Sequence, residues 1–144
     1  LIPTPDQAVD GNWQVIGLAD LNLDGDTDFL WYNYTSGKIV YWWMNGSMVR
    51  ITGNFTNPAN AGDNNWRVQS IGDYGSVCTD QTRDGQADVI WRNDNSGRIV
   101  AWILDSAGNR TSGCFTCPTA VGGTCDPNDP PPAGATDWVL VGPR

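Results

Sequence analysis

A short acidic segment occurs twice in this chain, and the repeat that it marks limits the fold more than any other feature. The first copy covers residues 20–28 and the second covers residues 80–88, so the two begin 60 residues apart. Each copy places oxygen-bearing side chains at alternate positions, followed by a glycine and a last carboxylate. Hard cations such as calcium take about six to eight oxygen ligands from a flexible loop. The segment therefore predicts both a metal site and an internal repeat.

The residues around each acidic segment repeat as well. The matched runs are 13–17 with 66–72, 29–33 with 89–93, and 36–42 with 96–102. The tryptophan-led run begins once more at 138–142. Asn-Gly and Ser-Gly pairs separate the apolar runs, and these residues tolerate the positive φ that tight hairpin turns need. Each unit is therefore predicted to hold four short strands, and a strand-rich repeat of this period indicates blades or arrays.

The composition favours an all-β chain and restricts its partners. All 16 acidic residues are aspartate, and the chain has 17 Gly and 9 Pro, whereas helix surfaces usually use glutamate and lysine. The net charge of −8 argues against nucleic acid or an anionic membrane as a partner. No stretch is long and apolar enough for membrane insertion. The lack of histidine removes the commonest general base, so we do not expect an enzyme.

The repeat divides the chain into four parts. We expect a polar arm at 1–12, a first unit at 13–65, a second unit at 66–137 and the opening strand of a third at 138–144. The second unit carries an insertion at 73–78, ahead of its acidic segment, and a long loop rich in cysteine and proline.

The cysteines indicate an oxidising compartment. An even count in a loop-rich acidic chain predicts two disulfides and an extracellular or cell-surface location. The four residues are Cys78, Cys114, Cys117 and Cys125. Three pairings are possible, of which Cys117–Cys125 with Cys78–Cys114 is one. A redox pair within 114–117 would need a βαβ context, and a zinc site would need all four thiolates.

Taken together, these residues resemble the FG-GAP/VCBS repeat. The resemblance rests on Trp-x-Val-x-Gly, then Asp-x-Asn-x-Asp-Gly-x-x-Asp, then an apolar-apolar-Trp strand and Ser-Gly-Lys/Arg-Ile-Val-x-Trp. It covers 13–52 and 66–112 and restarts at 138. The family builds the four-stranded blades of integrin-type β-propellers. The resemblance therefore implies two propeller-like blades, each with a structural calcium ion in the loop between its first and second strands.

The resemblance also implies the calcium ligands. They are the side chains of Asp20, Asn22, Asp24 and Asp28 with the carbonyl of Asp26, and those of Asp80, Thr82, Asp84 and Asp88 with the carbonyl of Gln86. Thr82 is a weaker ligand than Asn22, and Arg83 adds a positive charge, so we expect the second site to be weak or empty. An EF-hand would need glutamate where the chain has Trp31 and Trp91. A polar turn that binds no metal is the simpler alternative.

The aromatic residues fall into two groups. Tryptophans that recur in phase with the repeat are predicted to pack between strands. Four aromatic residues have no aromatic counterpart in the second unit, and we interpret them as an exposed patch that contacts a partner or a glycan. They are Tyr32, Tyr34, Tyr41 and Trp43.

Four Asn-x-Ser/Thr triplets are candidate glycosylation sites in a secreted eukaryotic protein, although chance would produce some of them. They begin at Asn33, Asn45, Asn54 and Asn109.

Two units are too few to close a propeller, which has about four to eight blades. We therefore expect self-association, or other subunits that complete the structure, with donation of the terminal strand as one route. The start at Leu1 rather than Met indicates a processed or trimmed chain. The sequence predicts a non-catalytic calcium-binding protein of cell-surface assembly or adhesion. The alternatives are a subunit of an extracellular filament or pilus and a glycan-binding lectin module.

Overall fold

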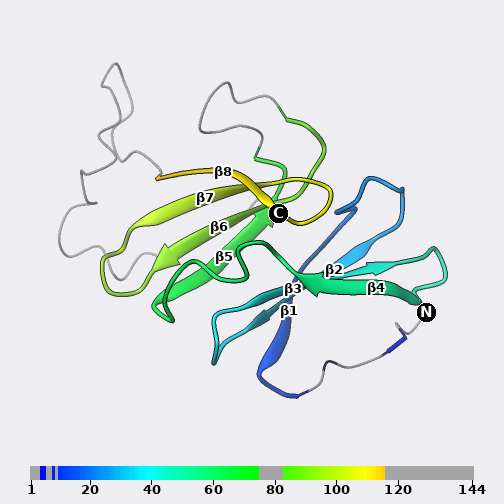
Figure 1. Cartoon of the computed structure of the whole chain (residues 1–144), viewed down its shortest axis with the longest axis horizontal. Helices are drawn as coiled ribbons and strands as arrows, with labels where there is room; N and C mark the ends of the chain where they lie inside the picture. Colours follow the sequence, from blue (N-terminus) through cyan, green and yellow to red (C-terminus); the bar gives the residue numbers. More distant parts are fainter. Residues whose placement is uncertain (1–3, 6–7, 9, 75–82, 116–144) are drawn as a thin grey trace.

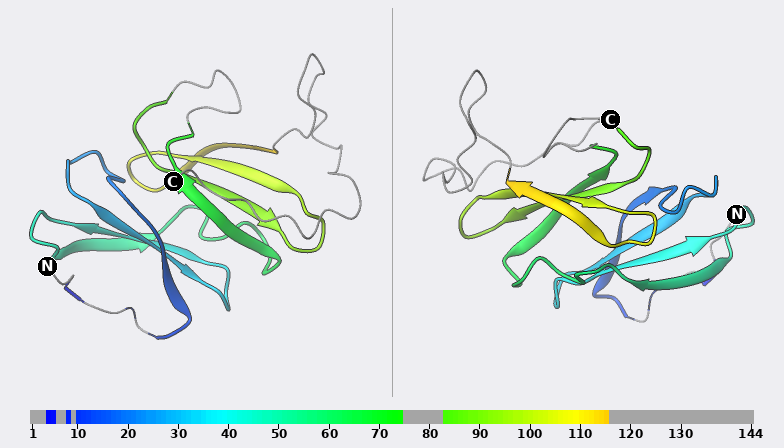
Figure 2. Two further views of the ribbon diagram at one scale, coloured as in Figure 1. Left: turned by 180° about the vertical axis from the view of Figure 1, so that it is seen from behind. Right: turned by 45° about the horizontal axis from the view of Figure 1, so that its top comes forward.

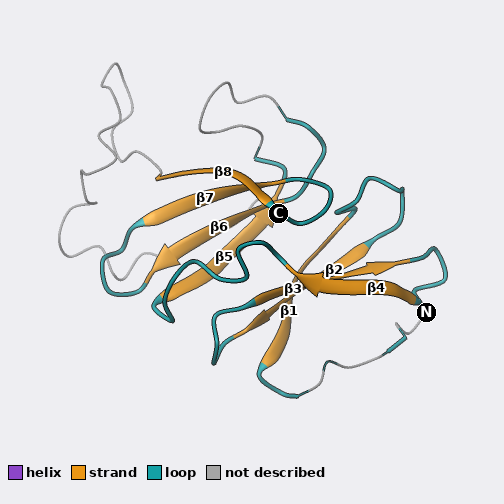
Figure 3. Ribbon diagram, in the orientation of Figure 1, coloured by secondary structure: helices purple, strands orange, loops and turns teal. Residues whose placement is uncertain are grey.

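The computed structural model describes residues 4–5, 8, 10–74 and 83–115, and within these ranges the regular elements are all strands (Figure 3). The strands are β1 (Trp13–Ala19), β2 (Asp28–Asn33), β3 (Ile39–Met44), β4 (Arg50–Phe55), β5 (Trp66–Gly72), β6 (Asp88–Asn93), β7 (Ile99–Leu104) and β8 (Arg110–Phe115). They form two antiparallel sheets, each with its four strands in chain order. The predicted all-β fold with four strands per unit is confirmed.

The turn between the second and third strands of each sheet shows why the hairpins recur. In the first sheet the Asn33 side chain accepts hydrogen bonds from the backbone N–H groups of Thr35 and Ser36, at 3.0 and 2.8 Å. Asn93 accepts the equivalent bonds in the second sheet. Gly37 follows with a φ of +68°, which a residue without Cβ adopts at little cost. The Ser-Gly turn predicted from sequence is therefore built by an asparagine and a glycine.

The first strand of each sheet contains a β-bulge, and this sets the true correspondence between the repeats. Ala19 pairs with Asp28 in the first sheet, and Gly72 pairs with Asp88 in the second. Ala19 and Gly72 are therefore equivalent. The sequence match of Gly17 with Gly72 is therefore wrong by two positions. That match aligned two glycines, whereas the strand pairing aligns Gly72 with Ala19.

The segment that enters each sheet pairs with the outermost hairpin of that sheet. Thr4 donates its backbone N–H to the carbonyl of Met48 at 2.8 Å, and Asn57 donates to that of Gly108 at 3.0 Å. Met48 and Gly108 are therefore equivalent residues, with φ values of +62° and +76°. The linker after β4 thus forms an isolated parallel bridge to the turn before β8.

The core lies between the two sheets, which pack face to face with β1 against β5 (Figures 1 and 2). Trp91 of β6 is fully buried, and its ring lies edge-on to Tyr32 of β2 with centroids 6.0 Å apart. Leu30 and Ile39 of the first sheet are buried in the same cluster. Large aromatic and aliphatic side chains from both repeats therefore share one core.

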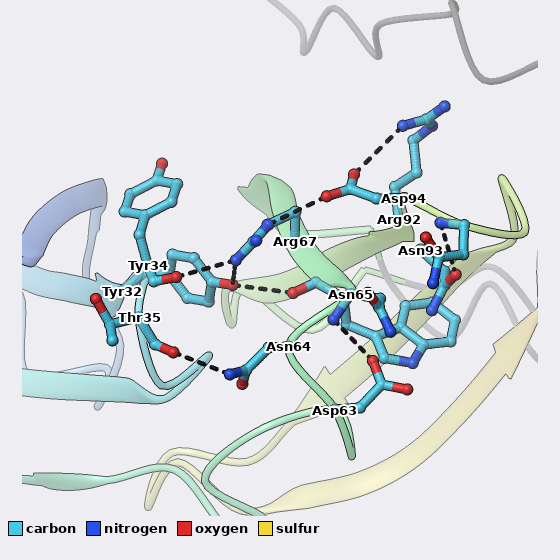
Figure 4. Close-up of polar contacts among 12 residues, drawn as sticks. Tyr32, Tyr34, Thr35, Asp63, Asn64, Asn65, Arg67, Arg92, Asn93 and Asp94 are labelled. Carbon is cyan, nitrogen blue, oxygen red and sulfur yellow. Dashed lines mark hydrogen bonds and ion pairs between the residues drawn. The ribbon is translucent and has the colours of Figure 1, made fainter.

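Polar bonds also join the two sheets, as Figure 4 shows for several of these residues. Each uses a side-chain donor and a backbone carbonyl of the other sheet or its linker. They are Tyr32 Oη to the carbonyl of Trp66 at 2.9 Å, Arg67 Nη1 to the carbonyl of Tyr34 at 3.1 Å, and Asn64 Nδ2 to the carbonyl of Thr35 at 3.0 Å. These bonds orient the sheets, whereas apolar burial supplies most of the stabilisation.

The exposed aromatic patch predicted from sequence is only partly present. Tyr32 is fully buried and Tyr41 is 7% exposed, so the prediction is wrong for both. Trp43 is half-buried against the core, and Tyr34 alone of the four is exposed, at 44%. The reason is that the face carrying Tyr32 and Tyr41 is the one that the second sheet covers.

The contact between β1 and β5 leads to a stability prediction. A Cβ at Gly17 would lie 1.5 Å from Cδ1 of Ile71, whereas a Cβ at Gly11 would meet nothing within 4 Å. We expect Gly17→Val to lower the free energy of unfolding by about 1–3 kcal/mol, because the sheets must move apart. Urea unfolding would measure the change. Gly11→Ala is the control and should change stability little. Equal effects of the two substitutions would contradict this packing.

Candidate metal centre in the β1–β2 and β5–β6 loops

The first acidic segment forms the loop between β1 and β2, as the sequence predicts, and its side chains turn back on the backbone. Asp20 accepts hydrogen bonds from the N–H groups of Asp24 and Gly25, at 3.0 and 2.9 Å. Asn22 Oδ1 accepts from the same Asp24 N–H at 3.0 Å. Asp24 Oδ1 accepts from the N–H of Asp26 at 2.9 Å. The loop therefore gathers carboxylate and amide oxygens within one tight turn.

Asp28 ends the first loop and ties it to the sheet. Its carboxylate is completely buried and accepts hydrogen bonds from the N–H groups of Leu21, at 3.0 Å, and Met44, at 2.8 Å. Burial raises the pKa of this carboxyl, and the nearby charges of Asp24 and Asp20 raise it further, although the two hydrogen bonds oppose the shift. A cation in the loop would offset this repulsion and favour the ionised form.

Asp88 has the same role in the second sheet. It is completely buried and accepts hydrogen bonds from the N–H groups of Tyr74, at 3.0 Å, and Leu104, at 3.1 Å. Burial raises its pKa to about 6, and the charges of Asp84 and Asp73 contribute. The two buried carboxylates are therefore equivalent in position, partners and electrostatics.

Asp73 is a site residue that sequence reasoning missed. Its Oδ2 accepts a hydrogen bond from the N–H of Gly85 at 3.0 Å, as Oδ2 of Asp20 does from Gly25. Asp73 therefore stands where Asp20 stands in the first loop. The insertion of the second unit lies inside this loop, not ahead of it. The sequence does contain a signal for this equivalence. The opening tryptophans of the two units are 53 residues apart, and so are Asp20 and Asp73.

The rest of the second loop is only partly described. Asp84 Oδ1 accepts a hydrogen bond from the N–H of Gln86 at 2.9 Å, which repeats the bond between Asp24 and Asp26. Asp80 and Thr82 lie outside the described residues, so their predicted roles as ligands stay predictions.

The donor atoms of the first loop suit a hard cation. They are all oxygens, which calcium and magnesium prefer, whereas zinc favours thiolate and imidazole. In the described ranges no three His, Cys, Asp or Glu residues are grouped as a metal cluster. The carboxylates instead accept bonds from the loop's own amides. Calcium binding would therefore require Asp20, Asn22 and Asp24 to share their oxygens between these amides and the ion.

Cys114 in β8 is disulfide-bonded, while Cys78, Cys117 and Cys125 lie outside the described residues, so the pairing stays a prediction.

Of the four asparagines that begin glycosylation triplets, Asn54 is exposed on β4 and Asn33 is buried. Asn45 and Asn109 are half-buried and hold the hairpin turns before β4 and β8.

A cavity of about 500 Å³ lies beside the second sheet. Its lining includes Pro58, Asn60, Trp66, Trp102 and Arg110. Trp102 is only 2% exposed, and the Arg110 guanidinium lies over its ring at 5.2 Å. A sugar that stacked on this ring would first have to displace the arginine, so the cavity gives the lectin hypothesis little support.

No family model, curated protein or solved structure matches this chain. The resemblance to the FG-GAP/VCBS repeat therefore stays a proposal based on the sequence motifs. Among the described residues, no helix is long and apolar enough to cross a membrane.

The buried carboxylates allow a prediction that does not depend on metal. With calcium chelated, Asp28→Ala should lower the free energy of unfolding by about 2–4 kcal/mol, because two buried N–H groups lose their acceptor. Asp88→Ala should have a similar effect. Asp24→Ala is the control, since this side chain is exposed and its loss should cost much less. Chemical denaturation measures all three, and equal losses would show that burial of Asp28 is unimportant.

Proposed function

We propose that this chain is a non-catalytic, extracellular calcium-binding repeat protein of the FG-GAP/VCBS type that acts in cell-surface assembly or adhesion. The calcium ion is structural. In the first loop it would be held by the side chains of Asp20, Asn22, Asp24 and Asp28 and the carbonyl of Asp26.

The observation that carries this proposal is the duplicated hydrogen-bond pattern of the two loops. In each loop, one aspartate accepts a hydrogen bond from the N–H of the loop glycine. A second aspartate accepts one from the N–H of the residue two positions after it. A buried aspartate accepts one from an N–H of the loop and one from an N–H of the third strand. A polar turn that served only to reverse the chain would not need this many carboxylates so close together. Burial raises the pKa of Asp28, and the charges of Asp24 and Asp20 raise it further; a divalent cation would relieve this repulsion.

The proposed role of calcium follows from where the loops lie. Each loop joins the inner strand of a sheet to its neighbour and is anchored to the third strand through Asp28 or Asp88. An ion bound there would stiffen the inner edge of the sheet, where β1 meets β5. The disulfide at Cys114 supports an oxidising location. A filament or pilus subunit is the second candidate, favoured by an apolar sheet face described below.

Calcium should raise the melting temperature, because a ligand that binds only the native state stabilises it. At about 100 times Kd, one site adds ~2.7 kcal/mol. Calorimetry with excess calcium and with chelator measures the shift.

Asp24→Asn should remove most of the shift. Asp63→Asn is the control, because Asp63 is exposed outside both loops and the amide keeps an oxygen for the N–H of Asn65. An unchanged melting temperature in wild type would refute calcium binding.

The second loop yields a separate prediction. If Asp73 is the counterpart of Asp20, Asp73→Asn should weaken calcium binding at this loop by about tenfold or more, because affinity depends on ligand charge. Isothermal titration in an Asp20→Asn background isolates the second site. Asp80→Asn in the same background is the comparison. A loss with Asp80→Asn alone would support the sequence alignment over the structural one.

A further inference from the structure

The two sheets carry equivalent apolar faces that differ in how well they are covered. We call the first face the outer face of sheet one, which comprises Val15, Leu18, Phe29, Trp31, Val40 and Trp42. Its counterpart is the inner face of sheet two, which comprises Val68, Ile71, Val89, Trp91, Val100 and Trp102. The inner face of sheet two packs against sheet one. No described residue places a sheet against the outer face of sheet one.

Exposure records this difference on the inner strands, β1 and β5, whereas Phe29 and Trp42 of the outer face are already buried, at 8% and 7%. On the outer face of sheet one, Val15 is 42% exposed and Leu18 is 56% exposed. Their counterparts on sheet two, Val68 and Ile71, are half-buried against sheet one. An apolar face with two such residues on one strand indicates an interaction surface.

The remaining pair of faces differs in exposure at two of its four positions. The inner face of sheet one comprises Leu30, Tyr32, Ile39 and Tyr41, and the outer face of sheet two comprises Ile90, Arg92, Ile99 and Ala101. Leu30 and Ile39 are 1% and 0% exposed, because the other sheet covers them. Ile90 and Ile99 are only half-buried. Ala101 and Arg92 of the same face are buried, at 0% and 9% exposed. The chain therefore has one sheet-to-sheet interface and two outer faces against which no described sheet packs.

We propose that the outer face of sheet one binds the outer face of sheet two of another copy of this chain, in a head-to-tail contact that resembles the internal interface. The proposal deepens the assembly part of the proposed function and rests on it. Because the two faces differ, the contact is heterologous, and successive copies would form a ring or a filament.

The volumes of the facing residues favour this pairing. Inside the chain, Tyr41 packs so closely on Gly108 that a Cβ there would lie 2.6 Å from Cε1 of the tyrosine. Across the proposed interface the equivalent residues are Ala101 and Met48. An alanine therefore stands in place of the tyrosine, and a methionine in place of the glycine. Met48 also keeps a side chain at a positive φ of 62°, a conformation that glycine adopts at the equivalent position, which indicates that the side chain is needed.

A second pair sets how closely the inner strands of two copies can approach. Inside the chain, Ile71 of β5 fills the space beside Gly17 of β1. Across the proposed interface, Leu18 would meet Ser70. Ser70 carries a Cβ where Gly17 has none, and a Cβ at Gly17 would lie 1.5 Å from Cδ1 of Ile71. The inner strands of two copies must therefore lie further apart than β1 and β5 do.

The polar link between the sheets can also be repeated. Tyr32 donates to the carbonyl of Trp66 inside the chain. Arg92 and Trp13 hold the equivalent positions, and a guanidinium is a donor as a phenol is. Arg92 lies 3.6 Å from Asp94, so a shared bond to the carbonyl of a neighbouring Trp13 would add to an existing ion pair.

The test is the mass of the full chain in solution with calcium present, measured by sedimentation velocity over a range of concentrations. We expect species heavier than one chain that grow with concentration. Leu18→Asp should abolish them, because it places a charge in the apolar face. Ile51→Asp is the control: Ile51 is 64% exposed, and its counterpart Thr111 stays exposed beside the internal interface. A monomer at every concentration would overturn the proposal, including the case in which the chain's own residues 138–144 cover the face.

A mixing experiment distinguishes head-to-tail contact from pairing of like faces. Leu18→Asp blocks one face and Ser70→Asp blocks the other, so each variant alone should be monomeric. Their mixture retains one intact interface and should give a dimer that contains one copy of each. A mixture that stays monomeric would overturn the proposed pairing. Urea midpoints close to wild type would confirm that both variants fold.

The calcium-dependent melting temperature serves as the independent readout. Loss of association with a normal calcium shift would refute this interface and leave the proposed calcium site standing. Association without any calcium shift would support the interface and refute the calcium site.

Discussion

A buried carboxylate in each sheet is the constraint on which the rest of the structure depends. Asp28 and Asp88 each hold two backbone N–H groups, one at the start of the acidic loop and one at the end of the third strand. An ionised group placed there would be unfavourable without those donors and without a nearby cation. The same residue therefore joins the architecture of the sheet to the proposed chemistry of the loop.

The same constraint affects the packing of the two sheets through their inner strands, β1 and β5. The loop held by each carboxylate starts at the end of β1 or β5, and these strands meet where Ile71 fills the space beside Gly17. A loop that shifted would move the strand, and a strand that shifted would open the core around Trp91. Metal binding, loop order and sheet packing are thus expected to change together rather than independently.

Much of the fold could be predicted because it is local. The alternation of apolar runs and Gly-containing turns predicted four strands per unit, and the turn at Ser36 and Gly37 formed as expected, with Asn33 accepting its hydrogen bonds. The first loop also lies where the motif placed it. The second loop was harder, because a β-bulge in β5 and an insertion conceal its register. The strand register and the bond from Gly85 together identified Asp73 as the counterpart of Asp20.

The sequence by itself determined the repeat, the strand content, the acidic loops and the surplus of carboxylates, since each depends on residues close together in the chain. Tertiary structure decided which faces are covered. The sequence predicted an exposed patch at Tyr32 and Tyr41, but both residues are buried. Nothing in their own strands shows that a second sheet, encoded about 60 residues later, lies over them. The same contact reveals which equivalent residues, Val15 and Leu18, have no sheet packed against them among the described residues.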